Sequence, residues 1–410
     1  MTRQVDVVVV GAGPAGLAVG AELARLGAGR VEILEREREA GGIPRHSHHT
    51  GYGLRDLHRL LSGPEYARRR VDLATAAGAV VRVETTVTGW AGLLALDVVS
   101  PAGMECIEAH AIVLATGARE RPRAARLAPG TRPGGVFTTG ELQQAVYLHG
   151  EKVGSRAVIV GAEHVSFSAA LTLAHGGARV AAMVTDLPRH QTYAAFRIGA
   201  AARFRFPLLT GHTVTAIRGR SRVEAVELTD AAGHIELVPC DTVVFTGDWI
   251  PDNELARRGD LAIDPGTNGP EVDATLRTSA FGVFAAGNLI HPVETADLVA
   301  LEAHRLAAAV ALFLEDGVTA PPTVGLRVEA PLAWIAPNRV GPTSGSPPLG
   351  RFTFRTNQFV SRSHLVVEQD GQRLYEKRTR ALIPNRPYGL DTSWLPGVNA
   401  AGPPVTVRLV

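Results

Sequence analysis

The sequence predicts an α/β protein with two three-layer domains and a small C-terminal β domain. Two units of strand, turn and helix support this prediction, one at the start of the chain and one beginning near residue 157. A run of short alternating strands after residue 323 predicts the β domain. With 410 residues, the chain is long enough to bury the cores of two or three domains.

The first unit carries the most specific motif. The β-branched run Val7–Val10 is too short for a membrane span and predicts a buried parallel strand, and a helix is expected over residues 17–26. In the glycine turn between them, successive glycines permit the tight bend, the close approach of a pyrophosphate and the packing of helix on strand. The helix N-terminus attracts phosphate. We therefore predict a Rossmann-like dinucleotide site, rather than an ordinary glycine-rich turn, at Gly11, Gly13, Pro14, Ala15 and Gly16.

The next strand, residues 31–34, ends in Glu35, where an acidic residue binds ribose hydroxyls. Arg36 either lies against an adenine ribose or is simply solvated. The loop over residues 43–53 then holds Arg45, His46, His48 and His49. Clustered histidines without cysteines or a carboxylate pattern do not favour a metal site, and we predict none. A loop that faces substrate or cofactor is the preferred interpretation.

Further along, residues 55–70 predict two short helices separated at Ser62-Gly63-Pro64, with Ser62 capping the second. Residues 80–114 alternate as antiparallel strands and end in an apolar strand followed by Thr116 and Gly117. This places a small hydroxyl and bare backbone at the carboxyl edge of the sheet, where a dinucleotide lies. The segment 119–123 is the expected hinge to a second domain.

That second domain has its own strand, turn and helix from residue 157, but only the first of the three glycines is present. Glu163 stands where close approach of a pyrophosphate requires glycine, and its charge repels phosphate. Ser166 replaces the packing glycine. We expect the fold to be retained, and both substitutions weigh against NAD(P) binding.

The last part of the chain returns to the first domain before the β domain begins. A strand near 283–285 ends at Gly287 and Asn288, and a helix is expected from about 291 to 315, with its N-terminus directed at developing negative charge. Beyond Pro321-Pro322 the strands alternate, and Asp370-Gly371 predicts a type I′ hairpin.

The composition argues against several classes of function. A net charge of +2 with no long Lys/Arg block gives no support for nucleic-acid binding. Two distant cysteines, Cys106 and Cys240, without a CxxC motif argue against a disulfide scaffold, an iron–sulfur site or a dithiol centre. No basic-then-apolar leader precedes the first strand, so we expect a cytoplasmic location and no membrane span.

The motifs GAGPAG, ATGARERP and GVFAAGN, in this order around a second dinucleotide unit, resemble the flavoproteins of the pyridine nucleotide–disulfide oxidoreductase superfamily. The similarity covers residues 1 to about 318. Within it, GGIPRHSHHTGYG, LSGPEYARR, VGAEHVSFSAALTL and GNLIHPVETAD resemble flavoprotein subunits of opine oxidases, hydrogen cyanide synthase and hydroxyproline dehydrogenase, and proteins associated with glycerol-3-phosphate dehydrogenase.

This resemblance implies bound FAD. The implied contacts are Gly11, Gly13, Gly16, Glu35, Gly42, Thr116, Gly117, Gly287, Asn288, Thr295 and Ala296. It also implies an FAD-binding domain in two parts, 1–121 and 251–318, around an NAD(P)-binding-like domain at 122–250, followed by the β domain at 319–410.

Three departures from the superfamily pattern matter. The redox CxxC motif is absent, which excludes disulfide reduction within this chain. Ser47-His48-His49 replaces a Cys-x-His sequence that relatives often carry. Asn288 replaces the usual aspartate, and its amide still forms hydrogen bonds while removing a negative charge beside the phosphates.

We expect an FAD-dependent dehydrogenase or oxidase component that oxidises a small amine, amino acid or hydroxy acid by hydride transfer to flavin. Electrons then pass to a partner subunit or carrier. Arg45 is the candidate to hold a substrate carboxylate or phosphate, and His49 or His48 the candidate to take the proton; alternatively, their loop only supports FAD. Two other functions stay open: an NAD(P)H-dependent flavin reductase, and a non-catalytic FAD-bearing subunit of a hetero-oligomeric dehydrogenase.

Overall fold

The computed structural model describes residues 2–193, 205–317, 321–343 and 345–410, which fall into two compact units. The first unit comprises residues 1–45, 50–118 and 251–410, and the second comprises residues 46–49 and 119–250. The division after residue 118 comes just before the expected hinge. The boundary that we expect between residues 318 and 319 lies outside the described residues, and the domain limits stay predictions.

The first unit is built on a parallel sheet with β1 (Thr2–Val10) at its centre. The strand order is β5 (Val80–Arg82), β2 (Val31–Leu34), β1, β8 (Gly103–Leu114), and β19 (Val283–Ala285) pairs with the carboxyl half of β8. An antiparallel meander of β6 (Thr86–Gly92) and β7 (Ala95–Ser100) extends the amino half of β8. Residues 7–10 of β1 are all buried, as the β-branched run predicts.

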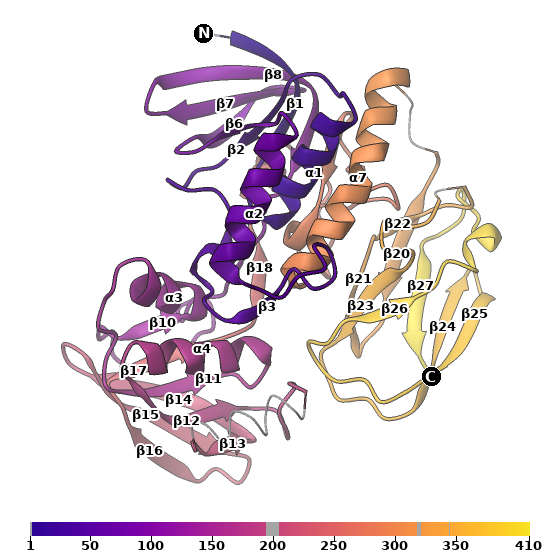
Figure 1. Ribbon diagram of the computed structural model, residues 1–410. Helices are drawn as coiled ribbons and strands as arrows, with labels where there is room; N and C mark the ends of the chain where they lie inside the picture. The colour runs from indigo at the N-terminus through magenta and orange to yellow at the C-terminus, as the bar shows by residue number, and fades with distance from the viewer. Residues whose placement is uncertain (1, 194–204, 318–320, 344) are drawn as a thin grey trace. The chain divides into compact units, whose positions relative to one another are not determined.

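Helices from the N-terminal segment and from the segment after β19 cover the sheet of the first unit (Figure 1). α1 (Pro14–Arg25) and α7 (Ala296–Asp316) lie side by side although they are far apart in the sequence, and they bury Leu17, Val299 and Leu306 in one core with the strands. α2 (Gly63–Ala76) packs beside α1.

The expectation of two helices over residues 55–70 is wrong for the first of them. The Gly53 carbonyl accepts hydrogen bonds from the backbone N–H groups of Leu57 and Arg59, and His58 takes a left-handed φ of 52°, so the chain turns instead of continuing as a helix. The expected cap of the second helix is present. The backbone N–H and hydroxyl of Ser62 both donate to the Glu65 carboxylate, at 2.9 and 2.6 Å.

The second unit contains another parallel sheet, so the prediction of two Rossmann-like domains is confirmed. Its strand order is β10 (Val136–Thr138), β17 (Thr242–Phe245), β11 (Arg156–Val160), β12 (Arg179–Thr185) and β13 (Leu208–Thr210). Helices α3 (Thr139–Tyr147) and α4 (His164–His175) pack against it. A three-stranded antiparallel sheet of β14 (His212–Gly219), β15 (Val223–Asp230) and β16 (Ile235–Pro239) completes the unit.

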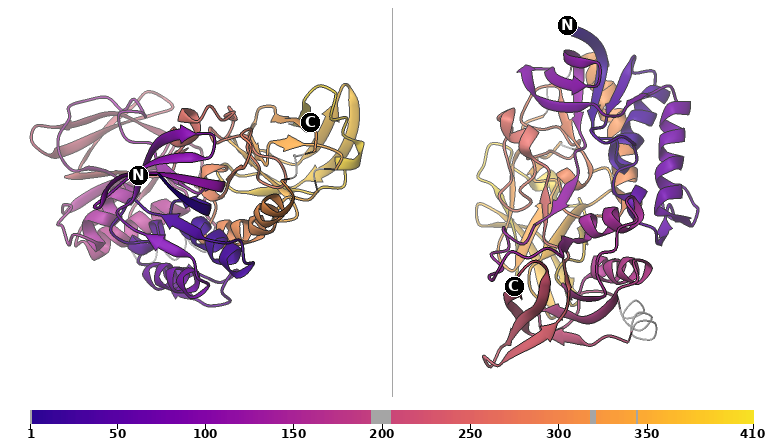
Figure 2. Two further views of the ribbon diagram at one scale, coloured as in Figure 1. Left: turned by 90° about the horizontal axis from the view of Figure 1, so that it is seen from above. Right: turned by 90° about the vertical axis from the view of Figure 1, so that its left-hand side faces the viewer.

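The C-terminal part of the first unit is the predicted β domain, with a hydrophobic core of its own. One sheet has the order β22 (Arg339–Val340), β20 (Val324–Val328), β27 (Val405–Leu409), β24 (Ser363–Gln369), β25 (Gln372–Thr379), and the other has the order β21 (Leu332–Ala336), β23 (Phe352–Thr356), β26 (Tyr388–Leu390). Figure 2 shows these strands, drawn in yellow and pale orange, gathered into one body that follows α7. Asp370 and Gly371 both have positive φ, so the type I′ hairpin forms as expected.

Short segments account for the remaining elements: β3 (Thr50–Tyr52), β4 (Leu61–Ser62), β9 (Ala118–Glu120), β18 (Trp249–Pro251) and α6 (Glu254–Arg258). Single 3-10 turns occur at Ile43–His46, Gly287–Leu289 and Leu395–Gly397. Within the described ranges, no helix is both long and apolar enough to span a membrane.

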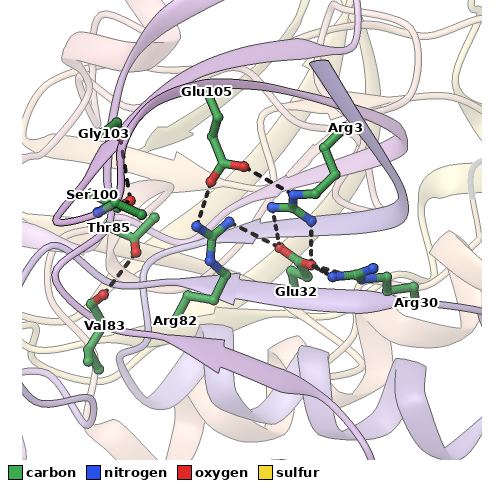
Figure 3. A network of polar contacts seen from close by, with 10 residues as sticks. Arg3, Arg30, Glu32, Arg82, Val83, Thr85, Ser100, Gly103 and Glu105 are labelled. Carbon is green, nitrogen blue, oxygen red and sulfur yellow. Dashed lines mark hydrogen bonds and ion pairs between the residues drawn. The ribbon is translucent and has the colours of Figure 1, made fainter. Parts of the chain in front are cut away.

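A partly buried ion network ties four strands of the first sheet together (Figure 3). Glu32 on β2 is fully buried and accepts a bidentate pair from Arg3 at 2.5 and 2.8 Å. Arg82 on β5 bridges Glu32 and Glu105 of β8, and Arg3 also donates to Glu105 at 3.1 Å. Burial by itself raises the pKa of Glu32, but the hydrogen bonds and charges of Arg3 and Arg30 outweigh it, so the pKa lies below its ordinary value.

We expect Glu32→Gln to lower the free energy of unfolding at neutral pH by about 2 kcal/mol, less than for a fully buried pair because the arginines are partly exposed. Since the folded-state pKa of Glu32 is lowered, its contribution is present above the unfolded pKa of about 4.5 and is lost as the pH falls through the folded value. Urea unfolding between about pH 3 and 7 checks this. An equal acid dependence in both proteins would contradict it.

Candidate functional site

The three glycines of the first turn have three different environments. Gly11 has a φ of +105°, and a Cβ there would lie 2.5 Å from the Ala115 carbonyl oxygen. A Cβ on Gly16 would lie 1.8 Å from the Gly11 carbonyl oxygen, so α1 and the turn touch through their backbones. A Cβ on Gly13 would meet nothing within 4 Å. The turn is therefore closed on two sides and open at Gly13, as a pyrophosphate site requires.

Two other predicted residues lie directly against this turn. Gly42 has a φ of +63°, and a Cβ there would lie 2.9 Å from the Gly13 Cα. Gly287 has a φ of +71°, and a Cβ there would lie 2.7 Å from the Ala15 Cβ. The fold thus brings two other segments of the chain, around Gly42 and Gly287, to the start of α1.

The end of β2 places a carboxylate beside the same turn. Glu35 is buried and accepts hydrogen bonds from the backbone N–H groups of Ala12 and Glu37, each at 3.0 Å. These bonds fix the orientation of the carboxylate and leave lone pairs for ribose hydroxyls. The Arg36 side chain is 65% exposed and its guanidinium lies 3.3 Å from the Asp252 carboxylate.

Asp252 is a member of the site that the sequence pattern does not identify. Its backbone carbonyl accepts from the Thr116 hydroxyl at 2.7 Å, and its N–H donates to the Gly117 carbonyl at 2.9 Å. The segment around Asp252 therefore runs along the carboxyl edge of the sheet. A proline and an aspartate stand at 251–252 in the sequence, but nothing in that pair of residues indicates this contact.

Asn288 closes the loop that leads into α7. Its Oδ1 accepts from the Glu294 N–H at 2.8 Å, and its Nδ2 donates to the Glu294 carbonyl at 3.3 Å. An aspartate accepts the first bond but cannot donate the second, which gives a physical reason for asparagine here. One N–H and one lone pair stay available for the predicted contact with a cofactor.

The N-terminus of α7 is held by residues from the loop and helix of segment 55–70. Arg55 donates to the Thr295 hydroxyl at 3.3 Å and lies 3.7 Å from the Asp297 carboxylate. The hydroxyl of the fully buried Tyr66 donates its proton to the Asp56 carboxylate at 2.5 Å and lies 3.3 Å from the Ala296 carbonyl. The sequence predicts Thr295 and Ala296 as site residues but not Arg55 and Tyr66, because only the tertiary contacts with the start of α7 reveal these two.

The three predicted catalytic residues divide between the two units. Arg45 belongs to the first unit, donates to the Glu39 carbonyl at 2.8 Å and lies 3.7 Å from the Glu37 carboxylate. His48 and His49 belong to the second unit. The His48 ring stacks on Tyr147 with 4.1 Å between ring centroids, and burial together with the charge of His175 lowers the pKa of His48. A neutral His48 is able to accept a proton.

In the described part of the chain, no group of three or more histidine, cysteine, aspartate or glutamate residues is placed to hold a metal ion.

The corresponding turn of the second unit is filled by one of its own side chains. Glu163, at the position that matches Gly13, is only 8% exposed. Its carboxylate accepts from the Thr246 hydroxyl at 2.6 Å and from the Ala162 N–H at 2.9 Å. The same carboxylate is packed so closely that a Cβ on Gly247 would lie 2.5 Å from its Oε1. Burial raises the pKa of Glu163 and so disfavours its charged form, and the side chain blocks a phosphate chiefly by occupying the space.

Comparisons with known proteins agree with this architecture. Residues 5–307 match the family described as pyridine nucleotide-disulphide oxidoreductase. The alpha subunit of sarcosine oxidase from Corynebacterium sp. is 28% identical over 66% of this chain and 29% of its own length. The A subunit of opine oxidase from Agrobacterium tumefaciens is 26% identical over 69% of this chain and 61% of its own length. This chain thus spans less than two thirds of the length of each of these relatives. The expected resemblance to opine oxidase subunits is confirmed.

Solved structures share the fold. T. acidophilum thioredoxin reductase superposes with a TM-score of 0.63 at 23% identity, over 77% of this chain and all of that protein. L-Proline dehydrogenase from P. horikoshii superposes with a TM-score of 0.53 at 19% identity, over 78% of this chain and 57% of that protein.

FAD fits the site of the first unit. The open space at Gly13 and the N-terminus of α1 suit a pyrophosphate, and the Glu35 carboxylate suits the adenosine ribose. The N-terminus of α7, a helix of 21 residues, would offer N–H groups and a positive dipole end to a bound flavin.

Gly13→Glu is expected to abolish FAD retention, because a side chain and a negative charge then occupy the open space. The backbone at Gly13 has an ordinary φ of −78°, so the substitution does not strain the turn. The FAD content per protein, measured by absorbance, should fall to below about a tenth of the wild-type value. Gly89→Glu is the matched control, since a Cβ there also meets nothing within 4 Å on β6. FAD content at the wild-type level in Gly13→Glu would overturn the site.

Proposed function

Because the chain belongs to the pyridine nucleotide-disulphide oxidoreductase family and is an FAD-dependent oxidoreductase, we propose that it oxidises a small amine, amino acid or hydroxy acid. The electrons pass on to a partner protein or carrier. The relatives named as sarcosine oxidase and opine oxidase subunits support this substrate class.

One structural contrast carries the proposal. The first glycine turn is open at Gly13, whereas the equivalent position in the second unit is Glu163, whose carboxylate is buried in its own turn. A reductase that draws electrons from NAD(P)H needs both turns to accept a dinucleotide. The closed second turn therefore favours a reaction in which the organic substrate supplies the electrons.

The cysteines support the same conclusion. Cys106 lies on β8 of the first unit and Cys240 precedes β17 of the second, and both are free thiols. Burial raises the pKa of Cys240 to about 11, so it is a protonated, inert thiol at neutral pH. Neither residue forms the adjacent pair that a dithiol relay requires.

In this proposal FAD supplies the acceptor for two electrons, and side chains of the chain bind the substrate and move its proton. Arg45 pairs with a substrate carboxylate or phosphate in exchange for its contacts with Glu37 and Glu39. His49 or His48 accepts the proton. The positive end of the α7 dipole stabilises the negative charge that accumulates nearby.

A second candidate function is a non-catalytic FAD-bearing subunit of a hetero-oligomeric dehydrogenase. The relatives favour it because their names denote subunits. An isolated chain that transfers electrons from substrate by itself would exclude it. The cytoplasmic location stays a prediction.

Anaerobic titration of the purified holoprotein tests the proposed function. We expect sarcosine, proline, an opine or a 2-hydroxy acid to bleach the flavin absorbance, and NADH and NADPH to leave it unchanged. Bleaching by NADH or NADPH would contradict the proposal. Glu163→Ala is measured alongside, because bleaching by NADH only in this variant would identify Glu163 as the barrier.

His49→Ala is expected to slow flavin reduction by the active substrate by about 100-fold, as for the loss of a general base. FAD content should stay at the wild-type level. Stopped-flow measurement of flavin reduction across pH checks this. His46→Ala, at a buried position in the same loop, is the comparison variant. An unchanged rate would remove His49 as the base.

A further inference from the structure

A buried arginine of the β domain contacts the loop that precedes α7. Arg355 on β23 is 5% exposed, and its guanidinium donates to the Val293 carbonyl and to Oε1 of Glu294, the latter at 3.0 Å. The guanidinium also lies over the Trp334 ring, 5.4 Å from the ring centroid. The β domain therefore binds both the backbone and the side chain of the loop before α7.

Burying this pair carries a large desolvation penalty. Glu294 and Arg355 lose their hydration, and a buried ion pair of this kind is often no more stabilising than apolar side chains of similar size. The β domain already has its own hydrophobic core. A buried charge pair between that domain and a loop is therefore better explained by the geometry it imposes than by the stability it adds.

The loop is the segment that sets the position of the α7 N-terminus. Asn288 binds both backbone groups of Glu294, and Arg355 binds the Glu294 side chain, so this residue is held from both sides. Thr295 and the first turn of α7 follow directly. Inside the same loop, the buried His291 bonds to Glu302 on α7 at 3.0 Å, which ties the loop to the second turn of the helix.

We propose that Arg355 is a positioning residue through which the C-terminal β domain fixes the N-terminus of α7 and thereby sets the affinity and reduction potential of bound FAD. The helix dipole favours the more negative, reduced flavin only while the helix end is held in place. The proposal rests on FAD binding and is independent of the substrate.

Arg355→Met tests the proposal in the purified holoprotein. We expect FAD to bind about tenfold more weakly, and we expect the two-electron midpoint potential to fall by about 30 mV, which corresponds to a tenfold loss of preference for reduced over oxidised FAD. Arg408→Met is the matched control. Arg408 lies in the same domain and pairs with Glu368 at 3.0 Å on its partly exposed surface, and its loss should leave both quantities unchanged.

Two further variants separate positioning from simple structural support. Arg355→Lys keeps the charge but replaces the guanidinium, whose Nη2 donates to both acceptors and whose plane lies over the Trp334 ring, with a shorter ammonium group. We therefore expect an intermediate fall in potential with normal folding. Glu294→Gln combined with Arg355→Met removes the unpaired buried charge. We expect it to recover thermal stability without recovering the potential.

A wild-type potential and FAD affinity in Arg355→Met, with only a lower melting temperature, would overturn the proposal. If Arg355→Met does not fold, an unchanged potential in Arg355→Lys would overturn it as well. Neither readout depends on substrate oxidation, so failure of the proposed function would be seen separately.

Discussion

The contact between Gly16 and the carbonyl oxygen of Gly11 is the constraint on which the first unit depends. It allows α1 to start immediately behind β1, with its free N–H groups directed at the open space beside Gly13. The other segments of the site then pack against this turn through residues that leave no room for a Cβ, at Gly42 and Gly287. A larger side chain at Gly16 or Gly42 separates backbones that touch, and one at Gly287 collides with the Ala15 side chain.

The two units share one topology, but only the first leaves the space at its glycine turn open for a ligand. Each has a strand, a turn and a helix in the same order, and in each the turn begins with a glycine of positive φ. In the first unit the space beyond the turn is left for a ligand. In the second, the Glu163 carboxylate accepts from the Ala162 N–H of its own turn and from the hydroxyl of Thr246, which follows β17, so a side chain of the protein fills this space.

The β domain holds the loop that precedes α7 in place. Its two sheets are stabilised by their own core, yet it directs a buried arginine at a loop of the first domain. Polar contacts of this kind are directional, whereas apolar packing tolerates sliding. Arg355, Asn288, Arg55 and Tyr66 together hold the start of α7 from several directions, which suits a helix end that must stay fixed while charge changes beside it.

Elements whose conformation depends on neighbours in the chain could be predicted from the amino-acid sequence. The buried strand, the glycine turn, the following helix, the Ser62 cap and the Asp370-Gly371 hairpin all follow from local sterics and hydrogen bonding. Tertiary structure alone decided which side chains meet. Asp252, Tyr66 and Arg355 join the site from far along the chain, Asn288 uses its amide within a loop, and Glu163 folds into its own turn. Such contacts depend on the packing of whole elements, and no pattern over neighbouring residues carries that information.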